Sequence, residues 1–187
     1  MGNATTVTNL TPIKTMLNNV VSVSCGDGHV VMLRQNADVF TCGRNTYGEL
    51  GLGNTSNTSL LSRASYGVTE ISAAGFETLI KNVDGTVLGS GLNTSGELAN
   101  GTFTNVKVFT NLNLPEEVNE VNKVKYIRAG KNSSAILLTD GTIYFSGNYT
   151  NGILEKTNQF VKAEYNDELE HEIVSLGRNN GLHTVAI

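Results

Sequence analysis

An eight-residue motif occurs three times in this chain, and the repetition restricts the fold more than any other feature. The copies begin at the landmark glycines Gly43, Gly91 and Gly147, which lie 48 residues (43 to 91) and 56 residues (91 to 147) apart. The first two copies end in Gly-Glu-Leu, and the third ends in Gly-Ile-Leu. A period of about 50 residues indicates units that stack or form a circle. The chain is therefore predicted to fold as a series of similar units.

A second marker, a small or apolar residue followed by glycine, runs in phase with the first. From its glycine to the landmark glycine the distances are 17, 16 and 17 residues (26 to 43, 75 to 91, 130 to 147). The nearly constant length predicts a rigid segment, and the variable linkers are predicted to be loops. The four pairs are Cys25-Gly26, Ala74-Gly75, Ala129-Gly130 and Leu176-Gly177.

Each constant segment has the pattern of short strands joined by tight turns. Alternating, β-branched stretches such as Val21–Cys25 precede the glycine pair, and short apolar runs such as Val30–Leu33 follow it. The dipeptides Asp84-Gly85 and Asp140-Gly141 predict hairpins, because glycine accepts the positive φ of a type I′ turn. About four short strands in roughly 50 residues are typical of one β-propeller blade.

The combined motif resembles the repeat of the regulator of chromosome condensation family, from about Val20 to Ile187. The shared order is small residue and glycine, strand, Asp-Gly, strand ending in glycine, then x-Asn-x-x-Gly-Glu-Leu, with Gly-Leu-Gly after the first copy. The resemblance implies a ring of seven blades, of which this chain encodes about half. Departures from the family pattern are non-aromatic residues before the landmark glycines and a histidine kept in only two units: Cys42, Ser90, Ser146, His29 and His183.

The predicted fold class is all-β, a β-propeller-like arc of about four blades, three complete and one partial, in an incomplete ring. We expect a single repeat domain over 1–187, with a partial blade at 1–35 and blades at about 36–83, 84–139 and 140–187. In this division the first unit lacks its own inner strand. An unclosed arc exposes strand edges that pair readily with another chain. We therefore expect self-association or a partner that covers the ends of the arc.

Noncatalytic protein binding or assembly is the predicted function, because a repeat scaffold with variable loops presents binding surface. The partner is expected at exposed blade edges and at the inter-blade linkers Asn54–Tyr66, Phe103–Val121 and Glu155–Glu172. The Asn- and Thr-rich composition suits a structural component of a virion or cell-surface particle. The family resemblance implies an alternative, guanine nucleotide exchange on a small GTPase, although no exchange residue can be assigned by position.

Charge argues against nucleic acid as a partner, because phosphate backbones are bound by clustered Lys and Arg. The formal net charge is −4, the pI is about 5.4, and the thirteen cations are scattered. The one loose cluster reads as a solvated strand face in preference to an anion site. It comprises Lys123, Lys125, Arg128 and Lys131. The sequence shows neither an apolar run of membrane-spanning length nor a secretory signal, and it does not indicate a compartment.

No catalytic, cofactor-binding or metal-binding residue is predicted, and the chain is not expected to be an enzyme. Two of its histidines, His29 and His183, lie in the repeat's hairpin, where such a side chain fixes a turn by hydrogen bonding, and His171 lies in an acidic linker. Glu49 and Glu97 occupy repeated positions, so each is expected to anchor its own turn.

The two cysteines lack the spacing of a zinc site. Cys25 and Cys42 are interpreted as small residues that fill narrow space. A disulfide between them stays open at this point, since it requires the two Cα atoms to lie within about 7 Å.

Overall fold

The computed structural model describes residues 2, 14–15, 17–118, 123–148 and 156–163. Within these residues the chain forms three antiparallel sheets of four strands each, ordered β1-β2-β3-β4, β5-β6-β7-β8 and β12-β11-β10-β9. The first sheet contains β1 Val20–Cys25, β2 His29–Arg34, β3 Val39–Gly43 and β4 Thr58–Ser65. The second contains β5 Val68–Ala74, β6 Glu77–Asn82, β7 Val87–Gly91 and β8 Val106–Asn111. The third contains β9 Val124–Ala129, β10 Ser133–Leu138, β11 Ile143–Gly147 and β12 Thr157–Lys162.

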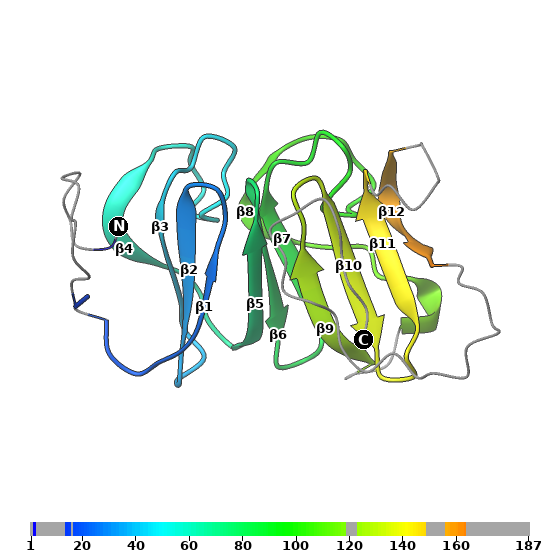
Figure 1. Cartoon of the computed structure of the whole chain (residues 1–187), viewed down its shortest axis with the longest axis horizontal. Coiled ribbons are helices and arrows are strands. Elements are labelled where there is room, and N and C mark those ends of the chain that lie inside the picture. The colour runs from blue at the N-terminus through cyan, green and yellow to red at the C-terminus, as the bar shows by residue number, and fades with distance from the viewer. Residues whose placement is uncertain (1, 3–13, 16, 119–122, 149–155, 164–187) are drawn as a thin grey trace.

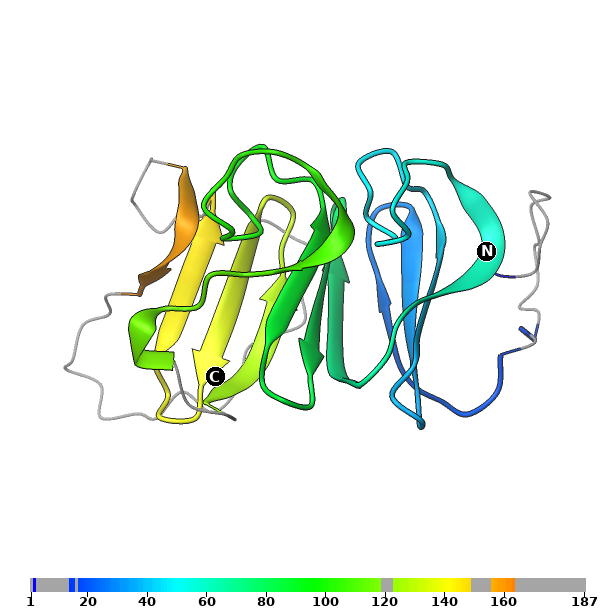
Figure 2. The same cartoon turned by 180° about the vertical axis from the view of Figure 1, so that it is seen from behind.

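The three sheets stand side by side as the blades of an open arc (Figure 1). The first strands of neighbouring blades contact one another, β1 with β5 and β5 with β9, and so form the inner side of the arc. The last strands, β4, β8 and β12, form the outer side, which faces the viewer in Figure 2. The all-β, propeller-like fold in an unclosed ring was predicted correctly.

The blade boundaries expected at 35/36, 83/84 and 139/140 are wrong. They fall between β2 and β3, β6 and β7, and β10 and β11, which are paired strands of one sheet. Each lies at a tight turn, such as the one closed by the Gly85 N–H donating to the Asn82 carbonyl at 3.1 Å. A tight turn joins two hydrogen-bonded strands, so it lies inside a blade. The first blade therefore has its own inner strand, β1.

Strand register also corrects the alignment of the repeats. The landmark glycines Gly43, Gly91 and Gly147 pair with the first residues of β2, β6 and β10, which are His29, Glu77 and Ser133. The φ angles of these glycines are 113°, 114° and 85°, a region that residues with a Cβ rarely adopt. Counting from these pairs, Ala74 and not Gly75 stands where Gly26 stands in the first blade. With this alignment the distance to the landmark glycine is 17 residues in all three blades (26 to 43, 74 to 91, 130 to 147).

Apolar side chains pack mainly between neighbouring blades. Between the first and second blades lies a cluster of Val31, Leu33, Val39, Val68, Ile71, Ala73 and Ile80. A larger cluster joins the second blade to the third and includes Leu79, Leu98, Ile127, Ile136 and Phe160. Because each blade contributes to a shared cluster, stability rests on contacts between neighbours, as in other repeat proteins.

The linkers expected to be loops contain the outer strands. β4 lies within Asn54–Tyr66, β8 within Phe103–Val121, and β12 within Glu155–Glu172. One 3₁₀ helix, Glu116–Val118, follows β8. Residues 164–187 of the blade expected at 140–187, among them His171 and His183, lie outside the described residues. Within the described part of the chain, no helix combines the length and hydropathy that crossing a membrane requires.

Candidate interaction surface

A serine on the inner strand of each of the first two blades reaches the backbone of the next blade. Ser24 Oγ accepts a hydrogen bond from the Ala73 amide at 2.8 Å, and Ser72 Oγ accepts one from the Ala129 amide at 2.9 Å. The register shows that the two serines are equivalent, since each is paired with the residue two positions after the start of the next strand. These bonds satisfy amide groups of inner strands that have no further strand beside them.

His29 joins the first blade to the second through a buried chain of hydrogen bonds. Its Nε2 lies 2.9 Å from Thr78 Oγ1, and Thr78 donates its only hydroxyl hydrogen to the Glu49 carbonyl at 2.7 Å. His29 Nε2 must therefore donate, which places the ring hydrogen of the neutral tautomer on Nε2. Burial lowers the pKa of His29 to about 4, outweighing the influences that raise it. The hydrogen bond of the ring thus fixes the junction between two blades, whereas the prediction placed it in the turn of the hairpin that contains His29.

An acid occupies the equivalent position at the next junction. Ser134 Oγ donates to Glu77 Oε1 at 3.3 Å, and Ser146 Oγ donates to the Glu97 carbonyl at 2.9 Å. Burial raises the pKa of Glu77 well above its ordinary value, and the nearby Glu97 carboxylate raises it further. Both influences favour the neutral form of the Glu77 carboxyl in the folded protein.

The repeated asparagine of the motif organises the loop that precedes each outer strand. Asn45 is fully buried, and its Nδ2 donates to the carbonyls of Asn54 and Ser56 at 3.0 and 3.2 Å. Its Oδ1 accepts from the Leu50 amide at 2.9 Å. Asn93 makes the same set of contacts in the second blade, with Thr102, Thr104 and Leu98.

These loops extend onto the outer strand of the next blade. The Gly53 amide donates to the Lys107 carbonyl in β8 at 2.7 Å, and the Gly101 amide donates to the Asn158 carbonyl in β12 at 3.0 Å. Neighbouring blades are therefore joined at the outer side of the arc as well as at the inner side. The segment Gly51–Gly53 is part of this connection.

The repeated glutamates Glu49 and Glu97 act locally. One carboxylate oxygen of Glu49 accepts from the Tyr47 amide at 2.7 Å, and one of Glu97 accepts from the Ser95 amide at 2.8 Å. Each glutamate anchors its own turn, as expected. In the described part of the chain, His, Cys, Asp and Glu side chains do not gather in groups of three or more that would hold a metal ion.

The two cysteines do not form a disulfide. Cys25 of β1 and Cys42 of β3 both pair with Val30 of the strand between them. Two strand spacings separate them by roughly 9.5 Å, beyond the range of a disulfide. Cys25 is exposed, whereas Cys42 is buried, and burial raises the pKa of the Cys42 thiol.

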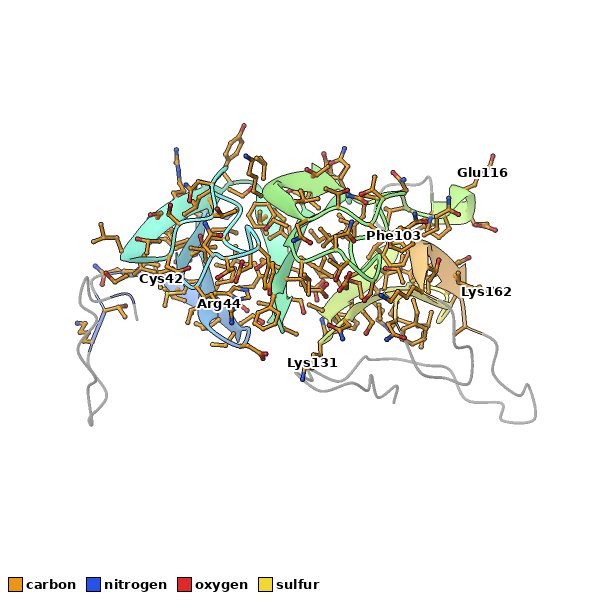
Figure 3. The ribbon with its side chains drawn as sticks, turned by 90° about the horizontal axis from the view of Figure 1, so that it is seen from above. Cys42, Arg44, Phe103, Glu116, Lys131 and Lys162 are labelled. Carbon is orange, nitrogen blue, oxygen red and sulfur yellow. The ribbon has the colours of Figure 1, made fainter. Side chains whose placement is uncertain are left out.

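The loose cation cluster is divided by the structure. Arg128 is buried and lies 2.6 Å from Glu70 Oε1, and Lys81 lies 3.0 Å from Glu70 Oε2. This network joins the second blade to the third. Lys123 donates to the Glu117 carbonyl at 3.0 Å, and Lys131 lies on the side of the arc opposite Glu116 (Figure 3). The cluster therefore does not present a shared anion site.

Two aromatic rings and a guanidinium group meet where the loops of the first and second blades adjoin. The Arg44 guanidinium lies 4.4 Å from the Phe76 ring centroid and 5.6 Å from that of Tyr47, and the two rings are 5.3 Å apart. The Arg44 side chain is 38% exposed. We call these three residues the rim cluster. Sequence reasoning missed it because Phe76 belongs to a different repeat, although Arg44 and Tyr47 lie within the first motif copy.

A second exposed surface lies on the first blade. Ser24, Val31 and Val39 face the second blade, so the alternate residues of these strands face away from it. Val21 and Val23 are 62% and 49% exposed there. We call this side of the sheet the outward face of the first blade; it consists of Val21, Val23, Val30, Met32, Arg34, Phe40, Cys42 and Arg63, of which Met32 and Cys42 are buried.

The sheets and their junctions define an open arc of propeller blades joined by repeated side-chain contacts. Two stretches, residues 20–49 and 36–78, match models of the regulator of chromosome condensation (RCC1) repeat. The chain belongs to the regulator of chromosome condensation repeat family.

Among curated proteins, the chain is 32% identical over 152 residues to human Probable E3 ubiquitin-protein ligase HERC6, covering 77% of this chain and 15% of that protein. It is 30% identical over 142 residues to the human X-linked retinitis pigmentosa GTPase regulator, covering 71% and 13%. The mouse RCC1-like G exchanging factor-like protein is 31% identical over 151 residues, covering 77% and 31%. The chain thus spans less than a third of the length of each of these relatives.

Solved structures show the same architecture. Human WBSCR16 superposes with a TM-score of 0.69 at 25% identity, covering 80% of this chain and 39% of that one. Prp20p of Saccharomyces cerevisiae superposes with a TM-score of 0.71 at 19% identity, covering 87% and 42%. The second likeness concerns the fold alone.

Proposed function

We propose that this chain is a noncatalytic protein-binding module that acts as one repeat domain over 1–187. The rim cluster of Arg44, Tyr47 and Phe76 is the observation that carries the proposal. Aromatic and arginine side chains dominate the binding energy of protein interfaces. The cluster is rigidly positioned, because Arg44 Nε donates to Thr46 Oγ1 at 3.1 Å and Tyr47 N–H is held by Glu49.

The remaining polar groups of the motif support the same conclusion. Buried His29, Asn45, Glu77 and Asn93 are engaged in joining blades or holding loops, which leaves them without access to a substrate. The structure of yeast Prp20p was reported together with its binding to Gsp1p and histones, and another shows Kap60 bound to yeast RCC1. Protein partners, and not nucleic acid, are therefore proposed for this chain.

The experiment that tests the proposal is affinity capture from the source cells with the native chain and with Arg44→Glu. We expect a defined set of proteins that the variant loses. The matched control is Lys162→Glu, which also reverses an exposed cation but lies at the end of β12 in the third blade, away from the rim cluster. Equal capture by the native chain and Arg44→Glu would contradict a role for the rim cluster.

Guanine nucleotide exchange on a small GTPase is the second candidate. It is favoured by two relatives, one named a GTPase regulator and the other a G exchanging factor-like protein. Release of a fluorescent GDP analogue from a panel of small GTPases tests it, and acceleration by the native chain would favour exchange over simple binding.

A finer proposal is that the module is a structural component of a virion or cell-surface particle and assembles with copies of itself. It rests on the Asn- and Thr-rich composition. Light scattering tests it, because a stable monomer would contradict self-assembly.

A further inference from the structure

Each junction inside the arc uses a pair of hydroxyl groups supplied by the later blade. In the second blade these are Thr78 and Ser90, which are paired across β6 and β7 and both donate to the Glu49 carbonyl. In the third blade they are Ser134 and Ser146, paired across β10 and β11. At each junction the two hydroxyl groups thus form hydrogen bonds with the preceding blade. Their partners are the side chain of His29 or Glu77 and the backbone carbonyl of Glu49 or Glu97.

The first blade lacks this pair. The register places Val30 and Cys42 at the equivalent positions of β2 and β3, where they pair with each other. Neither side chain can replace the hydroxyl contacts, since valine has no polar group and a thiol is a weak donor. A preceding blade of the same kind would bury its acid or histidine and its carbonyl against this surface without partners. Burying such a group without a hydrogen-bond partner is unfavourable.

The rest of the outward face of the first blade is apolar, and the arginines Arg34 and Arg63 add positive charge at its edge. Val23, Met32, Phe40 and Arg63 lie in one row across the four strands. The Arg34 guanidinium lies 5.9 Å from the Phe40 ring centroid, and the Arg63 side chain is 61% exposed. Arg63 lies 3.7 Å from Asp38, at the long end of ion-pair distances, and most of its own side chain remains exposed.

We propose that the outward face of the first blade binds an acidic segment of a partner protein through the apolar side chains of that segment. Leucine-like side chains would cover the exposed Val21 and Val23, and carboxylates would pair with Arg34 and Arg63. A second copy of this face would bring the same arginines together, which opposes a symmetric dimer. The inference rests on the proposed binding function and names a partner chemistry for a surface separate from the rim cluster.

Selection of short random peptides displayed on phage tests the proposal, with the native chain as target and Val23→Glu for counter-selection. We expect the enriched peptides to combine Asp or Glu with Leu, Ile or Phe. The best synthetic peptide should bind Val23→Glu and Arg63→Glu at least about tenfold more weakly than the native chain. Val83→Glu is the matched control, because Val83 is 71% exposed at the turn between β6 and β7 and lies on another blade.

Val23 and Arg63 are both exposed, so the two variants are expected to fold. If Val23→Glu does not fold, Arg63→Glu supplies an independent test. Absence of enrichment over the counter-selection, enrichment of basic peptides, or unchanged binding by Arg63→Glu would overturn the proposal. Sedimentation showing a dimer that Val23→Glu dissociates would also overturn it, because a second copy would then occupy the face. Loss of peptide binding by Arg63→Glu, with capture through the rim cluster unchanged, would support it. If the peptide experiments fail while protein capture still depends on Arg44, the outward-face proposal is overturned and the proposed function as a protein-binding module is not.

Discussion

His29 and Glu77 occupy the same place in successive blades, each paired with a landmark glycine and each hydrogen-bonded to a hydroxyl of the next blade. One is a base and the other an acid, and burial opposes the charged form of both. The two junctions of the arc are therefore expected to respond to pH in opposite directions.

Acidification should weaken the junction between the first and second blades. The pKa of His29 is about 4 in the folded protein and 6.5 in a model compound, so the unfolded chain binds a proton first. The contribution of His29 to stability is complete above pH 6.5 and falls as the pH drops toward 4, by about 3 kcal/mol in total. Urea unfolding at several pH values checks this, with His29→Gln as control. If the free energy of unfolding of His29→Gln falls between pH 6.5 and 4 as much as that of the native protein, the decline does not come from His29.

Raising the pH should weaken the junction between the second and third blades. Glu77 has a raised pKa, so the folded protein keeps a proton that the unfolded chain releases above 4.5. Stability is then lost as the pH rises from 4.5 toward the folded pKa. Glu77→Gln should increase the free energy of unfolding at pH 8 by at least about 1 kcal/mol, since the amide needs no proton. Lower stability of this variant at pH 8 would contradict a neutral Glu77.

Removal of the buried asparagine should loosen the loop that reaches the next blade. Asn45→Ala loses the donors to Asn54 and Ser56 and the acceptor for Leu50, and we expect a loss of about 3 kcal/mol in unfolding free energy. Asn36→Ala is the control, because Asn36 is an exposed turn residue, and its loss should cost less than about 1 kcal/mol. Equal effects of the two substitutions would argue against the role given to Asn45.

Thiol labelling checks the placement of the cysteines. In the absence of reductant, the native protein should react at Cys25 alone, because Cys42 is buried and its thiol pKa is raised. Both thiols should react after denaturation. A denatured, unreduced chain without free thiols would show that the two cysteines are bonded.

Strands and hairpins were predictable because they depend on neighbours in the sequence. The hairpin at Asp84-Gly85 is one example, although its turn is not the predicted type I′, because Gly85 has a positive φ and Asp84 does not. The alternation in Val21–Cys25 is another example. The blade boundaries were not, because a repeat can be divided at any point and only strand pairing shows that β2 and β3 belong together. The contacts between blades could not be predicted either, since His29 binds Thr78, which lies 49 residues further along the chain.

Arg128 shows what a better alignment of the repeats would have revealed. It occupies the position of Ser24 and Ser72, and it pairs with Glu70 of the preceding blade. That substitution is visible in the sequence once the strand register is known. Its ionic partner is not, because Glu70 lies 58 residues away and has no counterpart at the first junction.

The central claim is that successive blades are joined by specific side-chain contacts, and amide hydrogen exchange at Ala73 tests it most directly. The account predicts that Ser24→Ala accelerates exchange of the Ala73 amide and leaves the Ala129 amide protected, while Ser72→Ala does the reverse. Unchanged exchange at Ala73 in Ser24→Ala, or equal acceleration at both amides in either variant, would contradict the arrangement of blades described for this chain.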